Sequence, residues 1–210
     1  MNNYLTISAE SEISQSIKLS TFIGRAVPIK QNDDPHSQIS LITHRHSEAA
    51  HVSYAYTLGV TNPVQKYSDD GEPSGTAGLP LLELLKHKTI HNALIVVVRY
   101  FGGVKLGTGG LKRAYSSTGK RALDHAKPVM MKESQKIHFQ CSYSDWSRVE
   151  LFLTNKQFII PHVEYTDLVR ASVIIINNET ETVKKELAEI TASRLNFEAA
   201  ENLYWPHPID

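Results

Sequence analysis

The sequence predicts an α+β protein of two domains. Its 210 residues are enough for two hydrophobic cores, and 41% of them are hydrophobic. Segments with the period of a strand and segments with the period of a helix are mixed along the whole chain. Near residues 128–135 a proline follows a helical pattern, the sign of the charge changes and a new strand pattern begins. We therefore expect an N-terminal domain over residues 1–130 and a C-terminal domain over residues 135–205.

The first part of the N-terminal domain reads as strand, helix, strand. Ile17–Val27 has the pattern of a strand. Two aspartates followed by Pro35 are typical of a helix start, because proline suits the first turn. Large apolar or aromatic side chains recur at every second residue of His51–Val60, which predicts a strand with one aromatic-rich face.

The second part begins with a predicted loop over Tyr67–Gly78, which is rich in Gly, Ser and acidic residues. Leu79–Lys88 is Leu-rich and predicts a short helix, in which Pro80 fits only the first turn. Ala93–Tyr100 is β-branched and apolar on both faces, as in a central, buried strand. A glycine-rich stretch then leads into a helix over Leu111–Lys127.

This last helix is expected to be two-sided. At roughly 100° per residue, small and apolar residues share one side and cations share the other. The helix should therefore bury one side and present a cationic side to water. The predicted buried residues are Leu111, Ala114, Tyr115, Thr118 and Ala122, and the predicted exposed cations are Lys112, Arg113, Lys120 and Arg121.

The C-terminal domain reads as β-α-β-β-α-β, the order of the ferredoxin-like split unit. Two glutamates open its second helix, where acidic side chains favour the helix dipole. The expected strands are Lys136–Tyr143, Phe158–Tyr165, Leu168–Ile176 and Asn196–Tyr204, and the expected helices are Asp145–Lys156 and Glu179–Arg194.

The net charge is zero, but the charges are unevenly distributed. Residues 1–127 hold 14 Lys and Arg against 10 Asp and Glu, whereas residues 128–210 hold 8 against 12. No acidic residue occurs between Glu83 and Asp124, a stretch with eight cations. A basic block in a neutral protein favours a local anionic partner.

Composition also excludes several classes of protein. The longest apolar run, Ala93–Val98, is too short to span a membrane. The N-terminus lacks the basic and apolar regions of a secretory signal. The single cysteine, Cys141, permits no internal disulfide and is expected to be a buried, inert thiol. We therefore expect a cytoplasmic protein.

An acidic segment with the letters SDDGEPSGTAG supplies candidate catalytic residues. Asp69, Asp70 and Glu72 could hold a hard cation or act as an acid–base pair, and His51 is a further catalytic candidate. The alternative is turn chemistry, in which Ser74 or Thr76 caps the following helix. The acids lack the spacing of a calcium loop, and the histidines lack the spacing of a zinc site. We expect no metal and no cofactor.

The stretch FGGVKLGTGG lies between a strand and a helix, a layout in which backbone N–H groups can bind anions. It matches neither the P-loop nor the dinucleotide-binding pattern. The glycines could alternatively serve close packing alone. Several aromatic residues could stack on bases if exposed, although such residues more often lie in a core: Tyr54, Tyr56, Tyr100, Phe101 and Tyr115. Of these, Tyr54 and Tyr56 are the candidates for contact with a nucleic acid, although weaker ones than the cations. The candidate anion- or nucleic-acid-binding residues are Arg99, Lys105, Gly107, Gly109, Gly110, Lys112 and Arg113.

Two segments of the sequence resemble the signature of the YigZ/IMPACT family, here in its bacterial two-domain type. They are SDDGEPSGTAGLPLLELL and VVVRYFGGVKLGTGGLKRAY. The upstream strand HVSYAY is similar as well, although Ser53 stands where members often have Cys. The resemblance implies an N-terminal domain with the left-handed βαβ fold of a ribosomal protein and elongation factor G. It also implies a ferredoxin-like C-terminal domain.

These observations favour a non-enzymatic protein that binds RNA or the ribosome and affects translation or a stress response. The alternative is an enzyme acting on a small phosphorylated or anionic substrate, with the Asp69–Glu72 loop facing the glycine-rich basic loop. A third class is a module that binds a protein partner. The oligomeric state is left open.

Overall fold

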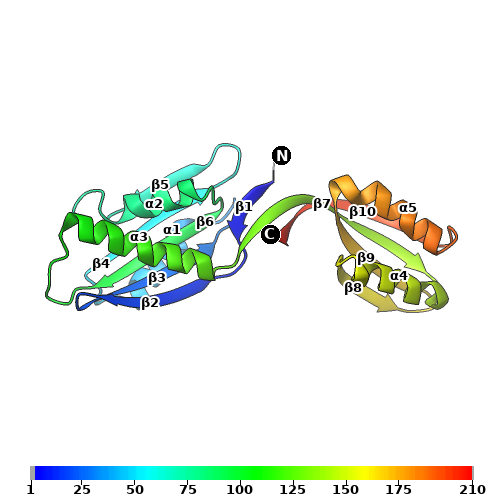
Figure 1. The fold of residues 1–210 in the computed structure, drawn as a ribbon, viewed down its shortest axis with the longest axis horizontal. Coiled ribbons are helices and arrows are strands. Elements are labelled where there is room, and N and C mark those ends of the chain that lie inside the picture. The colour runs from blue at the N-terminus through cyan, green and yellow to red at the C-terminus, as the bar shows by residue number, and fades with distance from the viewer. Residues whose placement is uncertain (1–2, 210) are drawn as a thin grey trace. The chain divides into compact units, whose positions relative to one another are not determined.

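A computed structural model describes residues 3–209 of the chain. It divides into two compact units, made mainly of Tyr4–Met130 and of Met131–Pro206 (Figure 1). Each unit combines helices with an antiparallel sheet, so the α+β class is confirmed. No helix within residues 3–209 is long and apolar enough to cross a membrane.

The larger unit is built on a five-stranded sheet with the order β2-β3-β6-β4-β5. Every neighbouring pair in this sheet is antiparallel. A short strand, β1 (Tyr4–Ile7), makes a parallel bridge to Ile90 outside this sheet. The five strands are β2 (Ser11–Ile17), β3 (Ser20–Pro28), β4 (His51–Leu58), β5 (Val64–Ser68) and β6 (Ala93–Tyr100).

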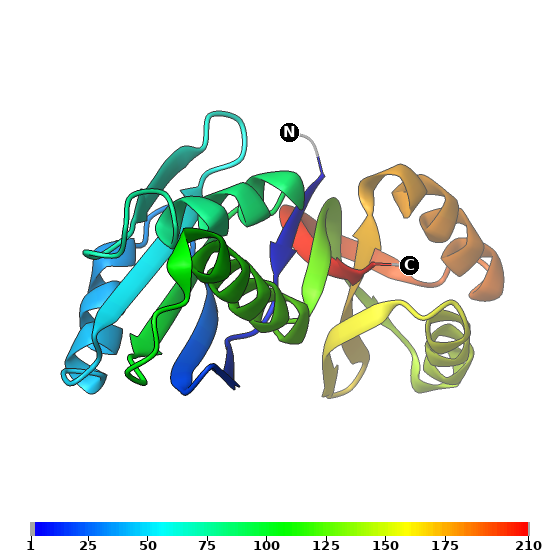
Figure 2. The ribbon, with the colours of Figure 1, turned by 60° about the vertical axis from the view of Figure 1, so that its left-hand side comes forward.

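Helices cover both faces of this sheet (Figure 2). On one face, α2 (Gly78–His87) and α3 (Gly107–His125) pack against Ile95 and Val97 of β6. On the other face, α1 (Pro35–Arg45) packs against the alternate residues of the same strand. The prediction of a central strand that is apolar on both faces is therefore confirmed.

The sequence signals explain the start of α1 and the faces of α3. The Asp34 carboxylate accepts a hydrogen bond from the His36 amide at 3.0 Å, and Pro35 occupies the first turn. The five residues predicted for the buried side of α3 are all buried, and the four predicted cations are all exposed. The helix begins at Gly107, one turn before the expected start, because the glycines at 107, 109 and 110 belong to its first turn.

Several expectations about strands are wrong in detail. The predicted strand Ile17–Val27 corresponds to β3 but begins too early, because Ile17 ends β2 and Lys18 and Leu19, which both have positive φ, form the turn between the two strands. Neither residue is the Gly or Asn that usually marks such a hairpin, so the turn has no sequence signal. The predicted loop begins too early, because Tyr67 and Ser68 end β5. Strands β1, β2 and β5 were not expected.

The smaller unit has the predicted element order and the strand order β10-β7-β9-β8. Strand β9 runs antiparallel to both β7 and β8. The lone Cys141 is buried in its core, and burial raises the pKa of the thiol. The elements are β7 (Pro128–Cys141), α4 (Tyr143–Asn155), β8 (Ile159–Tyr165), β9 (Val169–Ile176), the 3-10 turn Asn177–Glu179, α5 (Thr180–Ile190) and β10 (Asn196–Pro208).

Candidate functional site

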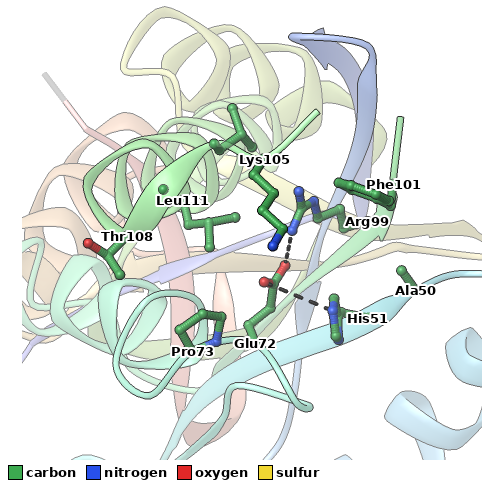
Figure 3. A pocket seen from close by; sticks show the side chains of 11 residues that line it. Ala50, His51, Glu72, Pro73, Arg99, Phe101, Lys105, Thr108 and Leu111 are labelled. Atoms are coloured by element: carbon green, nitrogen blue, oxygen red, sulfur yellow. Dashed lines mark hydrogen bonds and ion pairs between the residues drawn. The ribbon is translucent and has the colours of Figure 1, made fainter. Parts of the chain in front are cut away.

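A cleft of about 480 Å³ opens in the larger unit, at the end of the sheet where β4 begins and β6 ends (Figure 3). One wall comes from the acidic loop, here residues 69–77, and another from the segment that leads into α3. The acidic and glycine-rich segments of the sequence therefore meet. The lining residues are Ala50, His51, Glu72, Pro73, Arg99, Phe101, Lys105, Leu106, Gly107, Thr108 and Leu111.

Glu72 is a buried carboxylate on the floor of the cleft, with 7% of its surface exposed. Its Oε1 accepts hydrogen bonds from Arg99 Nη1 and from the Tyr115 hydroxyl, both at 2.7 Å. Arg99 is itself buried, and its guanidinium lies over the rings of Phe22 and Phe101. Burial, reinforced by the bond to Glu72, raises the pKa of Tyr115 well above its usual range. The phenol therefore stays a donor, and the floor holds a fixed ion pair.

His51 presents one ring nitrogen to this carboxylate. Its Nδ1 lies 2.6 Å from the carbonyl oxygen of Asp70, which can only accept, so Nδ1 carries the proton. The other ring nitrogen, Nε2, lies 4.0 Å from Glu72 Oε2. Glu72 and His51 thus place two polar atoms side by side, in reach of a ligand in the cleft.

Asp69 and Asp70 do not line the cleft. The Asp69 carboxylate accepts hydrogen bonds from three backbone amides, those of Gly75, Ala77 and Gly78, at 2.8–3.0 Å. It therefore closes the acidic loop and satisfies the N-terminus of α2. The expectation that Ser74 or Thr76 caps this helix is wrong, because the cap comes from a residue eight positions before the N-cap residue, Ala77.

Asp70 has a structural role too. Its carboxylate accepts a hydrogen bond from the amide of Val52 at 2.6 Å, and its carbonyl oxygen accepts one from His51 Nδ1. Ser53, where relatives often have cysteine, is buried and donates its hydroxyl to the Asp69 carbonyl at 2.9 Å. Among the candidate acids, only Glu72 reaches the cleft, and Ser53 supports the loop from behind.

The opposite rim of the cleft is cationic. Lys105, Gly107 and Thr108 line it where α3 begins, and no side chain caps this helix. The first turn of α3 contains no acidic residue. Its free N–H groups and the positive end of the helix dipole favour an anion at this rim.

The predicted anion-binding residues separate into two groups. Arg99, Lys105 and Gly107 line the cleft, whereas Lys112 and Arg113 lie exposed on the outer side of α3. Gly110 and Arg113 line a second hollow of about 330 Å³ together with Lys18, a cation of the β2–β3 turn. Sequence reasoning missed Lys18, because only the fold brings that turn to α3. We call Lys18, Lys112 and Arg113 the cationic surface of α3.

The aromatic residues also differ from expectation. Tyr56 is only 3% exposed, so it cannot stack on a base. Tyr54 is stacked on Tyr56 and contacts His36 edge-on, as part of the packing under α1. The aromatic side chain at the cleft is Phe101, which is 51% exposed. Phe101 was among the aromatic residues expected to be able to stack if exposed, and the structure exposes it.

The fold and the site define a two-domain α+β protein with a polar cleft in its larger unit. The Impact N-terminal domain matches residues 18–123, and a domain of unknown function, DUF1949, matches residues 139–194. The chain belongs to the IMPACT family. It is 32% identical to the family member YvyE of Bacillus subtilis over 97% of this chain and 94% of that protein.

The similarity extends to other bacterial members over nearly the full length. The chain is 29% identical to YigZ of Escherichia coli, covering 96% of this chain and 100% of that protein. It is 31% identical to a member from Thermus thermophilus, covering 85% and 97%. A solved structure described as "Crystal structure of an hypothetical protein" is 28% identical, with a TM-score of 0.60 over 96% of this chain and 98% of that one.

Proposed function

We propose that this protein binds RNA or the ribosome and thereby affects translation or a stress response. The observation that carries the proposal is the cationic surface of α3. Lys18, Lys112 and Arg113 are exposed, and none forms an ion pair with another residue between 3 and 209. Unpaired cations beside an uncapped helix N-terminus are suited to phosphate oxygens.

The architecture supports the same proposal. Strand order β10-β7-β9-β8 with two helices fits a ferredoxin-like domain. We infer that the larger unit has the left-handed βαβ fold that the family resemblance implies. Both folds occur in ribosomal proteins or translation factors, which act on RNA. We further propose a cytoplasmic location, in keeping with such a partner.

The test compares two double variants in binding to a short single-stranded RNA over a salt series. Lys112→Ala/Arg113→Ala should lower the affinity and flatten the dependence of log K on log salt by about 0.7 for each phosphate that the variant no longer neutralises. The matched control is Lys30→Ala/Lys66→Ala, which removes two other exposed cations. Lys30 follows the end of β3 that pairs with Ala93, at the far end of the sheet from the cleft.

Ribosome co-sedimentation across the same salt series extends the test to the assembled particle. Salt-reversible association that weakens in Lys112→Ala/Arg113→Ala supports the proposal. Equal affinity and equal salt slope for the wild type and both double variants would overturn the role of this surface.

A second candidate is an enzyme that acts on a small phosphorylated or anionic substrate. The observation that favours it is the pair formed by the Glu72 carboxylate and the His51 imidazole, whose Oε2 and Nε2 atoms lie 4.0 Å apart in the cleft. Such groups can accept or donate protons during a reaction. Turnover of phosphorylated compounds by the wild type, lost in His51→Ala, would support this candidate.

A further inference from the structure

We propose that the cleft is a binding site for a single ribonucleotide, recognised by its phosphate, its ribose hydroxyls and its base. The inference concerns residues other than the cationic surface of α3, so it does not depend on RNA binding there. It shares the cleft with the enzymatic candidate but holds whether or not the ligand is converted.

The shape of the cleft suits a compact ligand. A volume of about 480 Å³ falls within the range of small-molecule sites, roughly 300–1,000 Å³. The start of β4, the acidic loop, the end of β6 and the start of α3 all contribute to its walls. A cleft of this size lined by four segments fits one nucleotide unit rather than a length of strand.

The phosphate would bind at the rim formed by Lys105 and the first turn of α3. An observation besides the helix N-terminus points to an anion there. Lys105 lines the cleft, is exposed and forms no ion pair with another residue between 3 and 209, whereas the other lining cation, Arg99, is already paired with Glu72. The charge of Lys105 is therefore available to a phosphate group.

The opposite end of the cleft offers two polar atoms to a ligand. Glu72 Oε1 is occupied by Arg99 and Tyr115, but Oε2 accepts no hydrogen bond from any residue between 3 and 209. His51 Nε2 lies 4.0 Å from Oε2. Two neighbouring polar atoms fit the adjacent 2′- and 3′-hydroxyls of ribose, because each hydroxyl can donate and accept, and carboxylates bind ribose hydroxyls in dinucleotide sites.

Phe101 supplies the third element of recognition. Its ring lines the cleft and is half exposed, and the Arg99 guanidinium lies 5.3 Å from its centroid (Figure 3). An exposed aromatic ring is a stacking surface for any base. The ligand chemistry is therefore a phosphate ester with a cis-diol and a planar ring, which is a ribonucleotide.

The experiment is calorimetric titration of the full chain with separate probes. They are the four ribonucleoside 5′-monophosphates, their 2′-deoxy counterparts, ribose 5-phosphate and inorganic phosphate. At least one ribonucleotide should bind about tenfold more tightly than its deoxy counterpart, because the deoxy sugar leaves an acceptor unpaired. Ribose 5-phosphate should bind more weakly than the ribonucleotide and more tightly than inorganic phosphate.

Three variants assign the parts of the site. Lys105→Ala should weaken every phosphate-bearing probe about tenfold, and Lys105→Arg should restore most of the loss. His51→Phe should remove the preference for ribose while phosphate binding persists. Both side chains reach solvent, and urea unfolding checks that the variants fold. Lys30→Ala/Lys66→Ala, which removes two exposed cations outside the cleft, is the control and should bind nucleotides within about twofold of the wild type.

The outcomes separate this inference from the proposed function. RNA binding that fails while ribonucleotides bind would overturn only the role of the cationic surface of α3. No binding of any nucleotide at millimolar concentration would overturn this inference and leave that role intact. Equal affinity for ribo and deoxy forms would overturn the assignment of Glu72 and His51, and inorganic phosphate binding as tightly as a nucleotide would reduce the cleft to a simple anion site.

Discussion

Three buried polar side chains from three segments meet at the floor of the cleft: Glu72 from the acidic loop, Arg99 from β6 and Tyr115 from α3. Taking the carboxylate and the guanidinium out of water has a large free-energy cost, which their mutual contact offsets only while both are present. The same contact ties the acidic loop to the sheet and to α3. The geometry of the site and the stability of the domain therefore depend on the same atoms.

Removing the carboxylate should be much more costly than removing the phenol oxygen. Glu72→Ala leaves Arg99 buried without its anion, so we expect the free energy of unfolding to fall by about 3–5 kcal/mol. Tyr115→Phe removes one hydrogen bond to a charged acceptor and should cost about 1.5–3 kcal/mol. Urea unfolding followed by circular dichroism measures both. Tyr67→Phe, at an exposed residue of β5, is the control and should change little. Equal losses in all three variants would contradict this account.

Asp69 offers a second test at the scale of one residue. Its carboxylate accepts three backbone amides, so Asp69→Ala should destabilise the domain by at least the ~1–2 kcal/mol of a helix cap. Ser74→Ala, at an exposed position of the same loop, should stay within about 0.5 kcal/mol. Denaturant unfolding distinguishes the two. A larger loss of stability for Ser74→Ala than for Asp69→Ala would support the sequence-based expectation that Ser74 caps α2.

At the scale of an element, α3 depends on where its glycines lie. A Cβ at Gly119 would lie 2.5 Å from a methyl carbon of Leu81 in α2, so this glycine permits the two helices to approach closely. A Cβ at Gly109 would meet nothing nearer than the Arg113 guanidinium at 3.7 Å. The sequence alone does not distinguish the two glycines. Gly119 is needed for helix packing, whereas Gly109 lies at an open surface.

Alanine at these two positions should therefore have opposite effects on stability. Gly119→Ala overpacks the α2–α3 interface and should cost about 1–3 kcal/mol. Gly109→Ala should be neutral or stabilise by up to about 1 kcal/mol, because alanine favours the helix. Thermal unfolding of the two variants, which carry the same chemical change in the same helix, measures the difference. Destabilisation by Gly109→Ala as large as that by Gly119→Ala would show that position 109 is also packed.

At the scale of the whole molecule, the two units have separate hydrophobic cores, and the unfolding of the smaller unit can be followed by itself. Both tryptophans, Trp146 and Trp205, lie in the smaller unit, so their fluorescence follows that unit. Its buried Asp145 accepts hydrogen bonds from Arg194 and Arg148 at 2.6 Å and from the Ser142 hydroxyl. The Arg194 guanidinium is the main cause that lowers the pKa of Asp145 to about 2.

The smaller unit should consequently lose stability in acid over a defined range. The ionised carboxylate stabilises the folded state fully above its unfolded pKa of about 3.9, and this contribution is lost as the pH falls toward 2. The urea midpoint from tryptophan fluorescence should therefore decrease steeply between about pH 4 and pH 2. Asp145→Asn should be less stable at pH 7 and show a flatter profile, whereas Glu150→Gln, an exposed control, should follow the wild type. A wild-type profile that is flat in this range would contradict the assignment.

Much of the architecture could be predicted from local patterns. The bounds of β6 and the two sides of α3 follow from periodicity, and the element order of the smaller unit was predicted completely. Turns with weak signals could not be predicted, as at Lys18 and Leu19, where positive φ occurs without glycine. Short strands such as β1 and β5 were missed because so few residues carry too little pattern.

For the candidate site, the sequence by itself determined which segments carry the polar chemistry. It marked the acidic loop, the glycine-rich segment and the cations of α3, because composition and spacing are local properties. Only the tertiary structure decided which side chains share a cleft. Asp69 and Glu72 are three residues apart, yet one is saturated by backbone amides and the other faces Arg99 and His51. That difference arises from contacts between segments distant in the chain, and no local pattern encodes them.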